Sequence, residues 1–456
     1  MKGYLRRFAV LSALLLTFTT FSCGKDKVEE INDSQEQSES DYSGKTEITL
    51  GMPGFNVLIS PAVTEFNEIS ESSRLKIVDY SKLVNENDTE KILNQMKMDL
   101  VSGRAPDIIV LCPAYMSDFV RTGAFTDMYE FMEQYDGVKK EDFLENALRG
   151  FDVNGELPAL SYSYRIQTAV AKTENVGANM ENWTADEAMA AFEAMPEGMR
   201  FCCYDDEYSL ADFMMKRSAD SSTDLINCTC DFSREEFTEL LDFCGRNPVR
   251  GEYSSDDELF MDEAAAIIEN RQLVREIYIG AFEQSTGNMI WTDFNGEDFT
   301  FTGYPSETGC GAVTTSDWMF GISESCQNKQ AAWEFINYLL SEKFQKKTNE
   351  QNSGIPVMRG VMEDFLANKD RDDAASIYYS RLKNERGLME GEPIPEETVQ
   401  KIYDYITNVE FEPYWSFDID DIVREEYSAV VAGDKSGEQC AEILHSRVSI
   451  YLGERK

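Results

Sequence analysis

The residues of this chain with the strongest intrinsic chemistry are its 10 cysteines and its single histidine. The most closely spaced cysteines, at 202–203 and 228–230, lack the two-residue gap of a zinc knuckle, and His445 alone cannot complete such a site. With Cys23 set aside, an odd number of cysteines remains, so they cannot all pair within the chain. We therefore expect no metal and no cofactor, and thiols that stay free or form a few disulfides.

Arrangements for catalysis are poorly supported by the sequence. A G-x-S-x-G motif is absent, and His445 lies in a charged segment where we expect it on the surface. The 84 acidic residues could always supply a carboxylate pair for glycoside cleavage, so their abundance indicates nothing. The segment 293–298, DFNGED, lacks the glycine that a calcium loop needs at its sixth position. We predict a protein that is not an enzyme.

Aromatic and neutral polar side chains gather where three predicted strands end. The segments 46–52, 74–81 and 107–112 read as strands, and the last contains a continuous apolar run typical of a parallel strand covered on both faces. In a parallel sheet, ligands collect beyond the carboxyl ends of the strands. The residues at these ends are Phe55, Asn56, Tyr80, Ser81 and Tyr115.

Local signals predict the helices between and after these strands. Ser60 before Pro61 indicates a helix start, and Asn87 or Asp88 indicates another helix, which closes near Gly103. The resulting β-α-β-α-β order implies a parallel sheet with right-handed crossovers. Capping boxes predict further helix starts at Thr184 with Glu187, Ser233 with Glu236, and Ser436 with Gln439.

The N-terminal segment has the layout of a secretory signal. Basic residues precede an uncharged run over 8–21, which is shorter than a membrane-spanning helix, and Ser22 is small enough for cleavage. A cysteine directly after the cut, here Cys23, is typical of a bacterial lipoprotein, in which the thiol is acylated. Thr20 and Phe21 depart from that pattern, so an uncleaved anchor and plain secretion stay open as alternatives.

Composition limits the possible structure of the residues after the signal. We assign 1–22 to the signal peptide and 23–45 to a flexible acidic leash, because a segment so poor in apolar residues cannot offset the entropy of ordering. The remaining residues, about 410, exceed one ordinary core, so we expect two domains. The formal net charge of −42 repels phosphate backbones, and we expect no nucleic-acid partner.

Several segments resemble the carbohydrate receptors of ABC importers, in the extracellular solute-binding family that includes maltose-binding protein. The stretch LVSGRAPDIIVL (100–111), followed by 118–133, is similar to the place where a helix ends in Ser-Gly-x-x-Pro-Asp before an apolar strand. The segment 303–345 is similar to the re-entry of the chain into the first lobe, and 354–360 to the turn after it. The segment 419–454 is similar to the closing helices.

The resemblance implies an α/β, two-lobed periplasmic-binding-protein-like fold of type II. Each lobe would be a mostly parallel sheet flanked by helices, with the ligand in a cleft between the lobes. The first lobe would comprise 46–158 and 305–350, and the second 159–304 and 351–456. A carbohydrate, most simply an oligosaccharide, would be the ligand, and permease subunits the partners. The protein would be a monomer that is anchored to the outer face of the bacterial cell membrane. Its two lobes would close on the ligand by a hinge motion.

A sugar presents apolar C–H faces and a rim of hydroxyls, so a sugar cleft combines aromatic rings with polar side chains. The resemblance places Trp415 where the family has an aromatic ring over the ligand. Each aromatic candidate could equally pack in a core, and Trp333, inside an amphipathic stretch, is expected there. The further candidates are Tyr162, Tyr164, Arg165, Trp291, Tyr304, Glu307, Asp317 and Trp318.

Other classes of function stay open at this point. The acidity would also suit a receptor for a peptide or a polyamine. A surface glycan hydrolase, or a protein-binding lipoprotein with no small ligand, would share the same anchor. Turnover of labelled glycans would identify the hydrolase.

Overall fold

A computed structural model describes the compact unit that begins at Thr46. The predictions for the signal peptide, for most of the leash, and for Cys23, Phe55, Asn56, Trp291 and Asp317 fall outside the described residues. The structure describes residues 44–54, 59–84, 88–250, 262–263, 265–280, 290, 294–307, 309–316, 318–350, 354–367, 394–410 and 415–455.

The described strands form two larger sheets and one short hairpin. They are β1 (Thr46–Met52), β2 (Ser73–Asp79), β3 (Ile108–Leu111), β4 (Ser163–Lys172), β5 (Thr223–Asp224), β6 (Thr229–Cys230), β7 (Val274–Ile279), β8 (Phe299–Thr300), β9 (Val313–Thr315), β10 (Met319–Ile322) and β11 (Ile355–Pro356).

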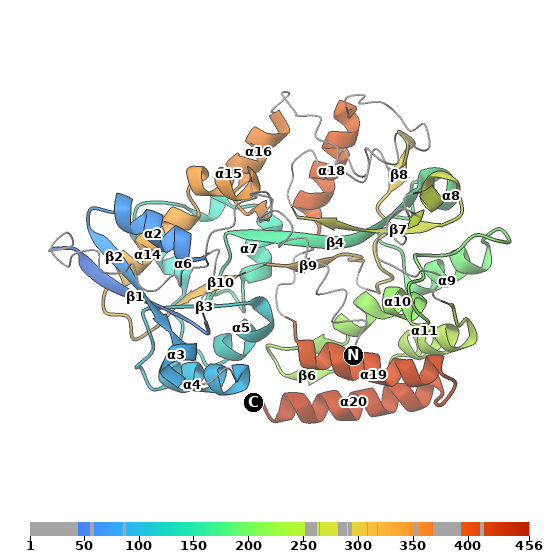
Figure 1. Cartoon of the computed structure of the whole chain (residues 1–456), viewed down its shortest axis with the longest axis horizontal. Helices are drawn as coiled ribbons and strands as arrows, with labels where there is room; N and C mark the ends of the chain where they lie inside the picture. The colour runs from blue at the N-terminus through green and yellow to red at the C-terminus, as the bar shows by residue number, and fades with distance from the viewer. Residues whose placement is uncertain are drawn as a thin grey trace, which may run out of the picture. The chain divides into compact units, whose positions relative to one another are not determined.

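Helices account for most of the remaining described chain (Figure 1). None of the described helices is both long and apolar enough to cross a membrane. They are α2 (Ile59–Ile69), α3 (Tyr80–Val84), α4 (Thr89–Val101), α5 (Pro113–Val120), α6 (Met128–Gln134), the 3-10 turn η3 (Lys140–Asp142), α7 (Glu145–Phe151), α8 (Thr173–Val176), α9 (Ala185–Glu193), α10 (Ser209–Asp220), α11 (Glu235–Arg246), α14 (Lys329–Leu339), α15 (Glu342–Glu350), α16 (Arg359–Ala367), α18 (Glu396–Asn408), α19 (Phe417–Val431) and α20 (Gly437–Gly453).

The first sheet has the order β10-β3-β1-β2 and confirms the three strands predicted at the start of the folded region. β1 pairs in parallel with both β2 and β3, as the β-α-β-α-β order requires, and β10 joins β3 antiparallel. The four residues of β3 are all buried, which matches the continuous apolar run. We refer to this sheet, with α2, α4, α5, α6 and α14, as the first lobe.

The second sheet, which we call the linking sheet, differs from the prediction of a mostly parallel sheet in each lobe. β4 is its centre, and its pairings with β7, β8, β9 and β11 are all antiparallel. The topology explains the direction for β9: β4 follows Leu160, which bridges to Phe320 of the first sheet, whereas β9 leads back into β10 of that sheet. Strands that leave and re-enter one lobe side by side must run in opposite directions.

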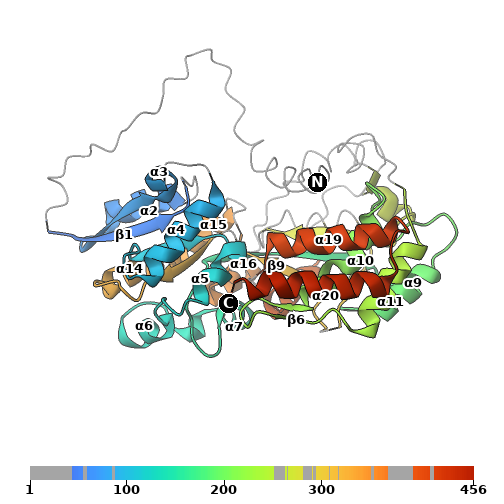
Figure 2. The same cartoon turned by 90° about the horizontal axis from the view of Figure 1, so that it is seen from below.

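The two faces of β4 enter different hydrophobic cores. Ile166 and Val170 belong to the first core cluster, whereas Ala169 and Ala171 belong to the second, as the two-residue period of a strand requires. The second cluster is built mainly from α9, α10, α11, α19 and α20, which we call the second lobe. Figures 1 and 2 show α19 and α20 lying side by side at its edge.

The first core cluster extends beyond the first sheet. It includes Ile355 of β11, Val361 of α16 and Ile402 of α18, which lie in a segment predicted for the second lobe. The lobe boundaries therefore stay a prediction, since the linking sheet shares its packing between the two cores.

Most of the local signals are confirmed at the level of single hydrogen bonds. The capping boxes of α9 and α20 both form, and the Asp88 side chain accepts a hydrogen bond from the Lys91 amide at the start of α4. Gly103 follows the end of α4 with a φ of 69°, a conformation that favours glycine.

Two helix starts were predicted wrongly. Arg234, not Ser233, precedes α11, because the Ser233 hydroxyl is held by Asp231 at 2.6 Å. This local bond competes with capping. α2 already contains Ile59, so Ser60 lies in its first turn instead of capping it.

Candidate functional site

One face of the linking sheet is partly exposed where the other face is closed. Register places Arg165 opposite Thr315, and Gln167 opposite both Tyr278 and Val313. Cross-strand partners share a face, so these residues form one surface, which we call the open face. Tyr278 is exposed and most of its neighbours are half-buried, whereas Tyr164, Ile166 and Thr168 on the opposite face are fully buried.

Arg165 gives the open face a guanidinium next to a phenol. The Arg165 side chain is largely buried, and its chain lies beside Tyr278. Burial raises the pKa of the Tyr278 hydroxyl, and the neighbouring Arg165 opposes part of that rise. The phenol therefore stays protonated at neutral pH and can donate a hydrogen bond.

Three aromatic rings meet at the boundary between the lobes. Tyr115, from α5 of the first lobe, lies 6.1 Å from the Phe417 ring of α19, measured between centroids. Trp415 lies 4.2 Å from the same Phe417 ring at an angle of 75°, an edge-to-face arrangement. We call Tyr115, Trp415 and Phe417 the aromatic group.

Two polar groups of the aromatic group are available for hydrogen bonding. The indole N–H of Trp415 is buried and has no hydrogen-bond partner among the described residues. A buried donor without an acceptor is costly, so this N–H would be stabilised by an acceptor. Burial, with the nearby Cys112 thiol and Asp418 carboxylate, raises the pKa of Tyr115, which keeps its hydroxyl a donor.

Charged side chains of α10 and α19 lie together in the second lobe. The Arg424 guanidinium is 3.2 Å from Asp212 and 3.6 Å from Asp206, and it lies over the Tyr208 ring. The Tyr427 hydroxyl also donates to Asp212. Arg424 and Phe417 are seven residues apart on α19 and so project from the same side of the helix. These charged and polar groups pair with one another inside the second lobe.

Contacts of Tyr304 connect α10 to the open face. Lys216, four residues after Asp212 on α10, places its ammonium 5.4 Å from the centre of the Tyr304 ring. The Tyr304 hydroxyl donates to Glu276 at 2.7 Å. Glu276 lies two residues before Tyr278 on β7 and therefore on the same face of the sheet.

Four predicted ligand residues lie in the cores instead. They offer no surface to a ligand in this structure, because each ring is buried. The hydroxyl or the ring of each tyrosine also contacts other residues of the chain. Tyr80 donates to Asp99 at 3.2 Å, Tyr164 donates to the Ile406 carbonyl at 3.0 Å, Tyr162 packs on Phe320 and Phe344, and Tyr304 packs on Phe213.

Of the remaining described candidates, some make hydrogen bonds at helix starts and others keep an exposed surface. Ser81 bonds Asp79 through both its amide and its hydroxyl, which begins α3. Glu307 is exposed and accepts from the Ala185 amide at the start of α9. Trp318 is half-buried against the first core. Of the predicted residues, Arg165 reaches the open face, and Tyr115 and Trp415 come together.

The cysteines do not form a reactive site. None of the nine from Cys112 onward forms a disulfide within the described residues. Burial raises the pKa of the Cys112 thiol to about 11, so it is protonated and weakly nucleophilic at neutral pH. No group of three or more potential metal ligands occurs within the described part of the chain. His445 is exposed on α20, as predicted.

A concave surface beside α2 of the first lobe lacks the aromatic rings that a sugar site uses. Its lining holds no aromatic ring, and its Glu65 is paired with Lys343 at 3.2 Å. The lining residues are Ser60, Pro61, Thr64, Glu65, Glu68, Ile69 and Lys343.

Sequence reasoning missed Tyr208, Asp212, Lys216, Tyr278 and Arg424. Asp212 and Lys216 are four residues apart, which is a helical spacing of opposite charges that usually marks a solvated surface. Nothing local distinguishes such a pair from a surface pair. The contact of Arg424 with α10 appears only in the folded chain.

Comparison with known families gives a match over most of the chain. A sequence profile described as bacterial extracellular solute-binding protein matches residues 80–372. None of the curated proteins matches the sequence.

Solved structures of several binding proteins are similar over 90% of this chain. The sugar-binding protein MalE from Xanthomonas citri is 14% identical, with a TM-score of 0.56 and 98% of that chain covered. An extracellular solute-binding protein from Alicyclobacillus acidocaldarius is 13% identical, with a TM-score of 0.55 and 98% of that chain covered. The cyclic alpha-maltosyl-1,6-maltose binding protein from Arthrobacter globiformis is 12% identical, with a TM-score of 0.51 and 100% of that chain covered. At such identities the likeness concerns the fold, and it confirms the predicted two-lobed α/β class.

Proposed function

The chain belongs to the bacterial extracellular solute-binding protein family, and we propose that it binds a carbohydrate, most simply an oligosaccharide, between its two lobes. It would deliver this ligand to the permease subunits of an ABC importer. It would act as a binding protein without catalysis of its own. The sugar specificity of similar structures, such as MalE from Xanthomonas citri, supports this direction only through a shared fold.

The observation that carries the proposal is the aromatic group. Tyr115 comes from the first lobe, whereas Trp415 and Phe417 come from the second, and the Tyr115 and Trp415 rings each lie beside the Phe417 ring. Aromatic rings stack on the apolar faces of sugars. A sugar held between Tyr115 and Trp415 would therefore be gripped from both lobes.

Polar groups of the second lobe and of the linking sheet would serve the hydroxyl rim of a sugar. A sugar oxygen would give the Trp415 N–H an acceptor, and the open face and the Arg424 group would supply further donors and acceptors. A ligand shifts the lobes toward closure only through contacts that the open form lacks. Contacts contributed by both lobes satisfy this requirement, and the closed shape would be what the permease recognises.

The N-terminal cysteine would hold the protein at the membrane. We expect Cys23→Ala to release the protein from the membrane fraction, while its melting temperature stays unchanged, because the composition of the predicted leash is too poor in apolar residues to contribute to a core. Ser22→Ala is a suitable control, since it keeps the thiol and a small residue at the cleavage position. Retention of the Cys23→Ala protein in membranes would contradict the lipid anchor.

A thermal-shift screen across a glycan panel tests the ligand class. A cognate oligosaccharide at about 100 times its dissociation constant should stabilise the protein by about 2.7 kcal/mol. A shift with spermidine or peptides, and none with glycans, would instead support a receptor for those ligands. Chromatography of the glycans afterwards would detect cleavage, and cleaved product would overturn the assignment as a binding protein.

A further inference from the structure

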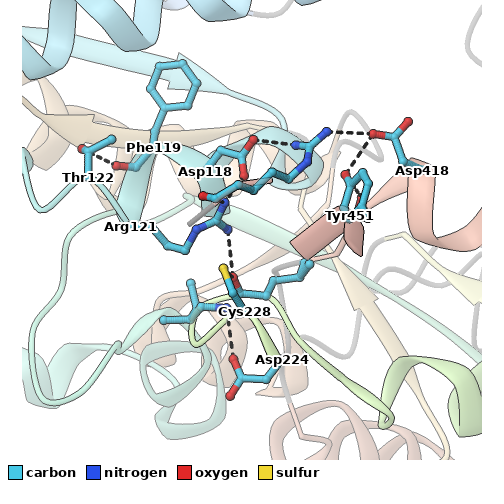
Figure 3. A network of polar contacts seen from close by, with 12 residues as sticks. Asp118, Phe119, Arg121, Thr122, Asp224, Cys228, Asp418 and Tyr451 are labelled. Atoms are coloured by element: carbon cyan, nitrogen blue, oxygen red, sulfur yellow. Dashed lines mark hydrogen bonds and ion pairs between the residues drawn. The ribbon is translucent and has the colours of Figure 1, made fainter. Parts of the chain in front are cut away.

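A polar network joins the lobes beside the aromatic group. The Arg455 guanidinium, just after α20, lies 2.7 Å from Asp118 of α5 and 3.0 Å from Asp418 of α19 (Figure 3). Asp118 belongs to the first lobe, whereas Arg455 and Asp418 belong to the second. One arginine therefore ties a carboxylate of each lobe to the other.

Arg121 makes a second connection across the same boundary. It follows α5 and is ion-paired to Asp118 within the first lobe. Its other guanidinium nitrogen donates at 2.8 Å to the carbonyl of Leu225, a member of the second core. The Arg121 nitrogen that is paired with Asp118 also donates to the Arg455 carbonyl at 3.3 Å. Movement of α5 away from α20 would break these bonds and the Arg455 pair together.

The network continues to the residue beside Trp415. The Tyr451 hydroxyl donates to Asp418 at 2.9 Å and lies 2.8 Å from the Ser416 hydroxyl. Ser416 is buried and directly follows Trp415. The Arg455 guanidinium also lies over the Tyr451 ring, 4.1 Å from its centre. The same residues that join the lobes therefore fix the start of α19, from which Trp415 and Phe417 project.

We propose that Asp118, Arg121, Arg455 and Asp418 form an interlobe latch that stabilises the arrangement with α5 against α19 and positions Trp415 for the ligand. Only one part of this inference, the positioning of Trp415 for the ligand, rests on the proposed function. Opening the lobes exposes the buried Arg121 guanidinium and separates Arg455 from Asp118, so the latch favours closure even without a ligand. Because the Arg455 pair is only partly buried, salt should weaken the latch.

Arg455→Met tests the latch, with Arg447→Met as a matched control. Arg447 lies within α20, eight residues before Arg455, is similarly exposed, and pairs with Glu425 and Glu426 inside the second lobe. Small-angle X-ray scattering of the ligand-free proteins should give a larger radius of gyration for Arg455→Met than for the wild type. Arg447→Met should match the wild type. High salt should shift the wild type toward Arg455→Met and leave that variant unchanged.

Binding provides a second readout once a ligand is known. Arg455→Met should weaken affinity about threefold to tenfold, and Arg447→Met should change it less than twofold. Asp118→Asn should cost less in the Arg455→Met background than in the wild type, since the Asp118–Arg455 pair is already broken there and only the Asp118–Arg121 pair is left to lose. Circular dichroism confirms folding, and Arg455→Lys, which keeps the charge, should be intermediate.

Two results would overturn the latch. The first is scattering of Arg455→Met that superimposes on the wild type at low salt. The second is an equal opening of Arg447→Met, which would indicate a general charge effect. A normal scattering response without any glycan binding would retain the latch and reject the carbohydrate, so the two proposals fail separately.

Discussion

Trp333 and Trp415 are the same residue type with the same unusual feature and opposite surroundings. Each indole N–H is buried and has no hydrogen-bond partner among the described residues. Trp333 is 1% exposed within α14, 5.7 Å from the Phe131 ring of its own lobe. Trp415 is half-buried, and its neighbour Phe417 contacts Tyr115 of the other lobe.

The comparison teaches that a buried indole N–H alone does not indicate a ligand site. Trp333 gains enough from apolar burial to tolerate a missing hydrogen bond, since a large aromatic side chain contributes several kcal/mol of packing. Trp415 buries less and stands where two lobes meet. The position of a ring relative to the lobe boundary, together with its remaining exposure, separates the structural role from the proposed binding role.

Trp333→Ala should give the largest effect, a loss of about 3–5 kcal/mol in the free energy of unfolding. The cause is the cavity left between α14 and α6. Urea denaturation measures the loss, and Trp333→Phe, which keeps most of the ring, should cost much less. Affinity for the ligand at low temperature should stay near the wild-type value. A folded Trp333→Ala protein with wild-type stability would break the comparison.

Tyr115→Ala should weaken ligand binding by about 1 kcal/mol, in the range of one aromatic contact. Tyr135→Ala is the matched control, because Tyr135 is a half-buried tyrosine of the same lobe that packs on Phe131 and has no contact with α19 among the described interactions. Calorimetric titration of both variants should separate them. Equal affinities would remove Tyr115 from the site.

Thr184→Ala should produce the smallest effect, about 1 kcal/mol or less of stability. The Thr184 hydroxyl and the Glu187 carboxylate cap α9 reciprocally, far in sequence from the aromatic group. Thermal melting should reveal the loss, while binding should be unchanged. A loss of affinity here would mean that second-lobe stability, and not the aromatic group, governs binding.

The sequence predicts the first sheet well because its signals are local. Apolar runs, the Asp88 cap and the glycine after α4 each act within a few residues. The antiparallel linking sheet escaped prediction because the direction of β9 relative to β4 is decided by a return of the chain well over a hundred residues later. Local pattern carries no such information.

The candidate site was predicted only in part for the same reason. Tyr80, Tyr162 and Tyr164 are aromatic residues at promising positions, as is Tyr115, and burial decides between them only after folding. The latch could not be predicted from local sequence patterns, since Asp118 and Arg455 are 337 residues apart. Trp333, whose amphipathic surroundings predicted a core position, is confirmed.

Trp415→Ala, measured by calorimetric titration and by melting without ligand, tests the central claim most directly. If Trp415 closes on a sugar face, the variant should lose about 2 kcal/mol or more of binding free energy. Its ligand-free melting temperature should change little, because the ring is only half-buried. A loss of several kcal/mol in ligand-free stability with unchanged affinity would contradict the account and place Trp415 with Trp333 in the packing.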